Sequence, residues 1–281
     1  MNKRGFELQF NIIFVIIVGL IVFGFFLFFT FKYIDLQKEK ESVEIARSMN
    51  NIIRGLKSTT QYKEFDINFD FDMDVNCDEI IINNGLYGQK IDSIFFASSG
   101  RGKDLWFWSR DLQKPFRIDT LLFIIDNSKK YYSNKPGFFP EFINEGNSNN
   151  FNVGVFFEGF SGYCPNSING EKIVCVEGNS IFIDSEEFPL IDDTLVYGAA
   201  FASAEQYSCS FDKIIDKWIN LLDIYLDKND RSTDCSNFRE DISAELNIIK
   251  NSLNEQNFEF DTEGLRRANT RLSDHDCEVV Y

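Results

Sequence analysis

The chain holds very few of the residues on which metal and acid–base chemistry usually depend. Its 281 residues include one histidine, His275, so a Ser-His-Asp triad would have to use that residue. The closest cysteines in sequence, Cys164 and Cys175, are too far apart for the tight pairs typical of structural zinc. The motifs H-E-x-x-H, G-x-S-x-G and G-x-x-x-x-G-K-[ST] do not occur. We therefore expect no catalytic residue, no metal site and no cofactor, and we interpret the chain as a non-enzyme.

Positive charge is scarce. The chain has 28 Lys and Arg against 44 Asp and Glu, a formal net charge of −16. Such a surface repels phosphate groups, so we expect no nucleic-acid partner. Carboxylates are so numerous that a pair able to hydrolyse a glycosidic bond stays open as an alternative, but no pair stands out from this background.

Near the N-terminus, the segment Phe10–Phe31 contains no charged residue and is very rich in Phe and Ile. A helix needs about 20 apolar residues to cross the hydrocarbon core of a membrane. The run is longer than the apolar part of a cleavable secretory signal, and no small-residue cleavage site follows it. We predict a short basic leader over residues 1–9 and a single transmembrane helix over 10–31.

Cysteines lie only after the membrane segment, and their number is even, which suits an oxidising compartment. The N-terminal tail is only a few residues long. We therefore expect a single-pass protein of the cell membrane, with its N-terminus in the cytoplasm and its main domain outside. The six residues are Cys77, Cys164, Cys175, Cys209, Cys235 and Cys277.

Beyond the membrane segment, Ile45, Met49, Ile52 and Leu56 recur at helical spacing. The chain also has no proline before Thr60, so the transmembrane helix is expected to continue as a stalk helix over residues 32–58.

The region 60–200 has the pattern of a β-rich domain with an antiparallel or mixed sheet. Alternating residues from Phe65 to Cys77 predict a half-buried strand. Its polar face, Asp66–Asp74, lacks the Gly and Glu of an EF-hand, and weak cation binding there is left open. Asn84-Gly85 predicts a hairpin turn. Further strands are expected at LWFWS, PFRIDTLLFIID, NVGVFFEG, KIVCVEG, NSIFID and DTLVYGAA.

The region 201–281 has helical periodicity in three segments and ends in CEVVY, which we interpret as a terminal strand. The fold class is therefore α+β, with a three-helix C-terminal unit. If these helices run up, down and up, their ends suggest one pairing of the cysteines. Because six cysteines allow 15 connectivities, it is a hypothesis. The pairs are Cys77 with Cys209, Cys164 with Cys175, and Cys235 with Cys277.

The start of the chain, MNKRG followed by FELQFNIIFVII, resembles that of type IV pilin-like proteins. The resemblance implies a leader cut between Gly5 and Phe6 on the cytoplasmic side, and a helix that then forms the core of a filament. It departs from the bacterial pattern at the fifth mature position, where a Glu is expected and Phe10 stands. The nearby acid is Glu7.

The whole chain also resembles uncharacterised archaeal single-pass membrane proteins, through its KRGFEL start, KPFRIDTLLFII and LVYGAAFASAEQYSC. Two hypotheses follow. The first is a pilin-like structural subunit that self-associates through its N-terminal helix. The second is an anchored extracellular binding or adhesion module that recognises another surface protein and forms no filament.

Overall fold

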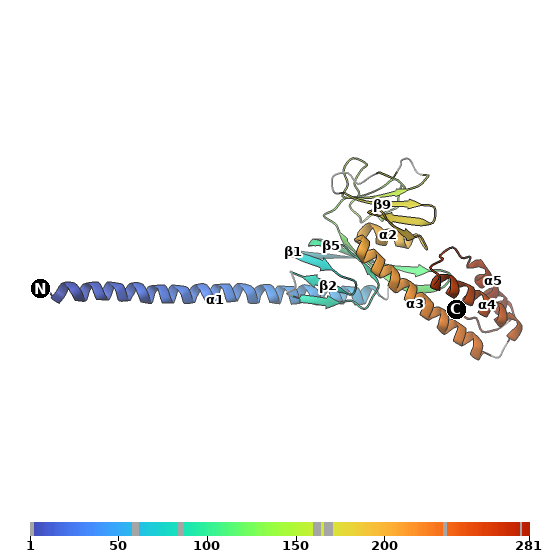
Figure 1. Cartoon of the computed structure of the whole chain (residues 1–281), viewed down its shortest axis with the longest axis horizontal. Coiled ribbons are helices and arrows are strands. Elements are labelled where there is room, and N and C mark those ends of the chain that lie inside the picture. Colours follow the sequence, from blue (N-terminus) through green and yellow to red (C-terminus); the bar gives the residue numbers. More distant parts are fainter. Residues whose placement is uncertain are drawn as a thin grey trace. The chain divides into compact units, whose positions relative to one another are not determined.

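The computed structural model describes the backbone of residues 3–57, 62–83, 87–159, 164–165, 171–232, 235–275 and 277–281, and the side chains of these residues except 3–11, 64–70, 87 and 101–104. The chain divides into two units, Met1–Ser48 and Met49–Tyr281. Figure 1 shows the elements in chain order, and the α+β class expected from the sequence is confirmed.

One helix, α1 (Lys3–Leu56), forms the first unit and ends in the second. It is 54 residues long and continues without a break through the apolar segment. Within the described residues, it is the one helix long and apolar enough to cross a membrane. Its last turns contribute Met49, Ile53 and Leu56 to the buried residues of the second unit. The predicted stalk helix is therefore present, and it ends at Leu56.

The second unit contains a six-stranded sheet, sheet A, in the order β3-β2-β1-β5-β6-β4. Its strands are antiparallel except that β4 runs parallel to β6. In β6 the side chains from Leu121 to Ile125 are all buried, which is typical of a strand covered on both faces. The strands are β1 (Tyr62–Val75), β2 (Glu79–Ile82), β3 (Tyr87–Lys90), β4 (Phe95–Phe96), β5 (Gly100–Gln113) and β6 (Arg117–Asp126).

In β1 the predicted alternation holds for the side chains that the structure describes: Phe71 and Met73 are buried, whereas Asp72 and Asp74 are exposed. The side chains of 64–70, which include the first acids of the Asp row, lie outside the described residues. The turn at Asn84-Gly85 also lies outside them, but β2 and β3 on either side of it pair antiparallel, as a hairpin requires.

A second, five-stranded sheet, sheet B, has the order β11-β10-β9-β8-β7. It is mixed: β7, β8 and β9 are parallel neighbours, whereas β9, β10 and β11 are antiparallel. The β-rich region therefore holds two sheets. The strands are β7 (Tyr131–Ser133), β8 (Val153–Phe157), β9 (Lys172–Glu177), β10 (Ser180–Ile183) and β11 (Glu186–Pro189).

One predicted strand is wrong: DTLVYGAA (193–200) forms a helix from its second residue onward, α2 (Thr194–Phe201). All eight of its residues are buried, so the segment has no polar face whose period could distinguish a helix from a buried strand. The helix contacts both sheets. Gly198 permits this approach, because a Cβ there would lie 2.7 Å from the ring of Phe96.

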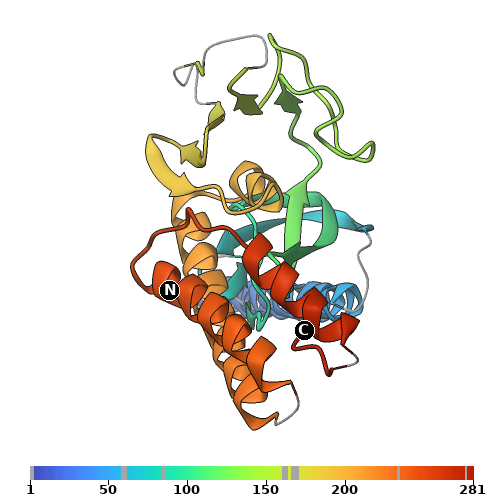
Figure 2. The same cartoon turned by 90° about the vertical axis from the view of Figure 1, so that its right-hand side faces the viewer.

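The three predicted C-terminal helices are present, as α3 (Ala204–Arg231), α4 (Ser236–Asn254) and α5 (Glu263–Asp274). Ser203 caps α3 by accepting a hydrogen bond from the backbone N–H of Gln206 at 3.2 Å. In Figure 2, α4 lies beside both α3 (orange) and α5 (red), in agreement with its contacts with these two helices.

The predicted terminal strand is wrong, because residues 277–281 form no strand. The N–H of Cys277 donates to the carbonyl of Leu272, and backbone groups further along bond to side chains rather than to another strand. The N–H of Val280 donates to Oδ1 of Asn269 at 2.9 Å, and Lys228 Nζ donates to the carbonyl of Val279 at 2.9 Å. The chain end is thus fastened onto the helices by side chains.

Candidate functional site

The apolar part of α1 is the most prominent candidate for a functional surface. From Ile12 to Phe31 its large apolar side chains are exposed within the described structure. Exposed apolar surface of this extent is typical of sites that contact a membrane or another protein. The proposed processing residues, Gly5 and Phe6, lie on the same helix, and their side chains are outside the described residues.

Three disulfides join the six cysteines in the predicted pairing, which is thereby confirmed. Their Cα–Cα distances, 5.7 to 6.4 Å, fall within the range usual for disulfides. Such a set is typical of a domain that folds in an oxidising compartment. The pairs are Cys77–Cys209, Cys164–Cys175 and Cys235–Cys277.

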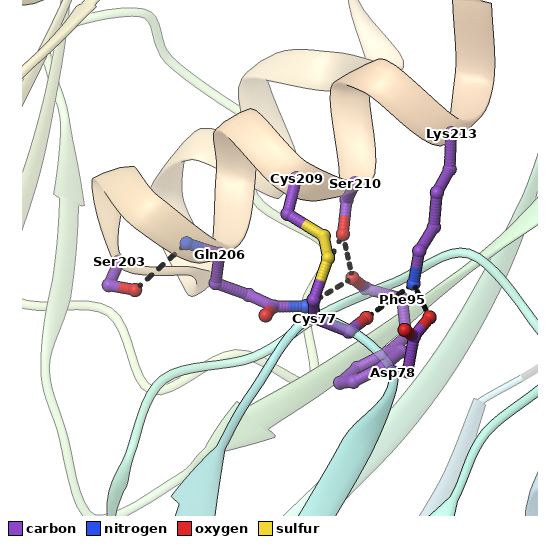
Figure 3. Close-up of a disulfide and its surroundings, with 8 residues drawn as sticks. All are labelled: Cys77, Asp78, Phe95, Ser203, Gln206, Cys209, Ser210 and Lys213. Atoms are coloured by element: carbon purple, nitrogen blue, oxygen red, sulfur yellow. Dashed lines mark hydrogen bonds and ion pairs between the residues drawn. A yellow bond between two sulfur atoms is a disulfide. The ribbon is translucent and has the colours of Figure 1, made fainter. Parts of the chain in front are cut away.

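The first of these disulfides connects sheet A to α3, beside an ion pair (Figure 3). Lys213 Nζ lies 2.6 Å from Oδ1 of Asp78 and donates a hydrogen bond to the carbonyl of Cys77. The hydrogen bond and the charge of Lys213 lower the pKa of Asp78. The carboxylate therefore stays ionised over a wide pH range, although it is largely exposed.

Next to this disulfide, α3 also makes a buried polar contact with β4. The hydroxyl of Ser210 and the amide of Gln206 both donate to the carbonyl of Phe95, at 2.6 and 3.2 Å (Figure 3). A buried carbonyl with two donors is fully satisfied. The disulfide and these bonds fix the first half of α3 on sheet A, and we interpret them as structural.

Lys172, the first residue of β9, has an enclosed ammonium group. Its Nζ donates to the carbonyls of Ala199, Ala200 and Ala202, at the C-terminal end of α2. Burial lowers the pKa of Lys172 to about 7, and the negative charge of Asp184 partly opposes this change. An amine of this kind could act as a nucleophile, but here its hydrogens are held by helix carbonyls, which is the arrangement of a helix C-cap.

A groove of about 680 Å³ separates β11 from the irregular segment 256–261. Carboxylates of Glu187, Glu259 and Asp261 line it. The ammonium group of Lys114 is held at one wall, because it donates to the carbonyl of Ile191 at 3.1 Å. Burial lowers the pKa of this lysine. Sequence reasoning missed the groove, since its walls are about seventy residues apart in the chain and no local motif marks either one.

The sequence DHDC near the C-terminus does not form a metal cluster in the part of the chain that the structure describes. The ring of His275 stacks on Phe238, with 4.6 Å between centroids. No group of three or more potential metal ligands is found among the described residues, which exclude Asp276. Comparison of the chain with known protein families, curated proteins and solved structures finds no match.

Proposed function

We propose that this chain is a pilin-like structural subunit of the cell surface, which assembles through α1 and exposes its acidic head outside the cell. One observation carries the proposal: an uninterrupted helix of 54 residues joins a basic N-terminus to a disulfide-bonded domain. Between Ile12 and Phe31 this helix exposes large apolar side chains and no charged residue. Such a helix is covered by lipid before assembly and by other copies of itself afterwards.

The N-terminal sequence supports the same proposal. Lys3 and Arg4 precede Gly5, and the apolar helix follows directly. A cut between Gly5 and Phe6 would remove the basic residues and leave a helix that begins at its apolar part. Because Phe10 replaces the expected Glu, the new amine would pair with another acid, and Glu7 is the nearest in sequence.

Mass spectrometry of the chain from native membranes tests the leader cut. We expect a mature N-terminus at Phe6 in the wild type. In Gly5→Val, a branched side chain at the cut should block processing and leave residues 1–5 attached. The matched control Gly19→Val alters a glycine with open space around it, and should be processed normally. A wild-type chain that keeps Asn2 and Lys3 would contradict the proposal.

Self-association is tested separately by a cysteine placed in the apolar helix. Each described cysteine is in a disulfide, so Gly19→Cys adds a single reactive thiol. We expect oxidation to link two copies through this position in the membrane. If oxidation at native expression levels gave only monomers, the result would favour the second candidate function, an anchored binding module. The acidic groove beside β11 is the observation that favours that alternative.

A further inference from the structure

The outer edge of β11 offers free strand backbone. β11 is the last strand of sheet B and pairs on one side with β10. The N–H of Leu190 donates to the carbonyl of Asn179 at 2.7 Å, which makes these residues a hydrogen-bonded pair. Because such pairs alternate along an antiparallel ladder, Phe188 also bonds toward β10. The N–H and C=O of Glu187 therefore point away from β10, at the edge of the sheet, together with the C=O of Pro189, which as a proline has no N–H.

The irregular segment 256–261 faces this edge across the groove. Residues 256–261 connect α4 to α5, and aromatic rings hold them in place: Phe258 packs on Phe211 at 5.5 Å and Phe260 on Trp218 at 5.4 Å. The N–H of Glu259 bonds within its own segment, to Oδ1 of Asn257. The segment thus forms a fixed wall and adds no strand to β11, which leaves a groove with aromatic surface and an open sheet edge.

Charge identifies the kind of partner that fits. The groove presents the carboxylates of Glu187, Glu259 and Asp261, each of which already accepts one hydrogen bond from the chain. Lys114 is the basic residue among those that line the groove. Its ammonium group donates a hydrogen bond to a backbone carbonyl and lies 5.5 Å from the centre of the Phe260 ring. The groove is therefore negative, within a chain whose net charge is −16. A ligand that supplies positive charge relieves the repulsion among these carboxylates.

We propose that this groove binds an extended, basic peptide segment of a partner protein, which adds to sheet B as a strand beside β11. Its backbone accepts a hydrogen bond from the N–H of Glu187 and donates to the carbonyls of Glu187 and Pro189. Its Lys or Arg side chains reach the three carboxylates, and its alternate apolar side chains contact Phe258 and Phe260. The site does not depend on whether α1 assembles, because all its residues lie within the second unit.

Binding of a defined probe tests the charge requirement. The probe is a fluorescent peptide of alternating Lys and Val, added to the full-length chain in a non-ionic detergent and followed by fluorescence anisotropy. We expect saturable binding that weakens about tenfold in the double variant Glu187→Gln/Glu259→Gln, since two ion pairs are lost. The control Asp230→Asn/Glu240→Gln removes the same charge from exposed positions on α3 and α4, and should bind like the wild type.

A second probe tests strand addition without any change to the protein. The same peptide with N-methyl groups on alternate amides keeps its charge but cannot pair along one edge, and we expect it to lose most of its affinity. Equal affinity of both peptides would overturn strand addition. The site itself would be overturned if the groove variant and the control variant lost the same affinity for the peptide. It would also be overturned if the wild type showed no saturable binding.

Discussion

Lys172 shows how one residue makes the stability of the head depend on pH. In the folded chain its pKa is lowered to about 7, because burial disfavours the charged amine. In the unfolded chain it returns to about 10.4. Between these values the unfolded state binds the extra proton. The free energy of unfolding therefore rises with pH between about 7 and about 10.4. Below about 7 both states carry the proton, so Lys172 adds no pH dependence there.

Replacing Lys172 with Met should remove this contribution. We expect the stability of the wild type, measured relative to Lys172→Met by urea unfolding, to increase by up to about 1.4 kcal/mol per pH unit between pH 7 and 9.5. Lys217→Met serves as the control, because Lys217 is a surface lysine paired with Asp119 at 2.8 Å. Parallel pH curves for the wild type and Lys172→Met would contradict this reading.

Individual residues also explain what the sequence could and could not predict. The alternation around Phe71 and Met73 predicted β1 because one face of that strand is buried and the other is exposed. Lys172 could not be recognised as enclosed, since the carbonyls that hold it belong to a segment about thirty residues away. A sequence pattern shows how regularly exposed and buried residues alternate along one element. Contacts between distant segments depend on tertiary structure, which such a pattern does not contain.

Among the elements, α3 is fixed to sheet A by the disulfide with the longest loop. Cys77 and Cys209 are 132 residues apart, against 11 for Cys164 and Cys175. In the chain-entropy model, the cost of losing a disulfide grows with the logarithm of loop length. We expect Cys77→Ala/Cys209→Ala to lose about 5 kcal/mol of unfolding free energy, and Cys164→Ala/Cys175→Ala about 3 kcal/mol.

Urea unfolding followed by tryptophan fluorescence measures both losses, because Trp218 is buried in the folded chain. If the Cys77–Cys209 variant lost less unfolding free energy than the Cys164–Cys175 variant, the entropy of loop closure would not be the main contribution of these disulfides to stability. The pairing itself was predictable, because three helices in alternating directions place Cys235, which precedes α4, and Cys277, which follows α5, at one end. Helix α2 was not predictable, since eight consecutive buried residues satisfy the pattern of a buried strand as well as that of a helix.

At the scale of the whole molecule, the proposal requires the acidic head to lie outside the cell. Asn149, in an exposed loop before β8, is a suitable reporter. We expect a membrane-impermeant maleimide to label Asn149→Cys on intact cells. The unsubstituted chain should give little background, because its described cysteines are paired. Labelling that appears only after lysis would place the head in the cytoplasm.

The whole-molecule features were partly predictable. The apolar run from Phe10 and the change from β to helical pattern near Ala200 identified the order of the parts. The groove could not be derived, because it exists only once β11 and the 256–261 segment are brought together. A binding surface made of distant segments leaves no local signature.

The disulfide between Cys77 and Cys209 also determines how the protein would respond to mechanical tension. If α1 is held in a membrane or filament while the C-terminal helices are pulled, the force passes from β1 directly into α3 through this covalent bond. The loop between the two cysteines, which includes sheet B, lies outside that path. This loop, with a sequence separation of 132, would reach a contour length of about 450 Å if fully extended. It therefore stays folded back under load until the disulfide is reduced.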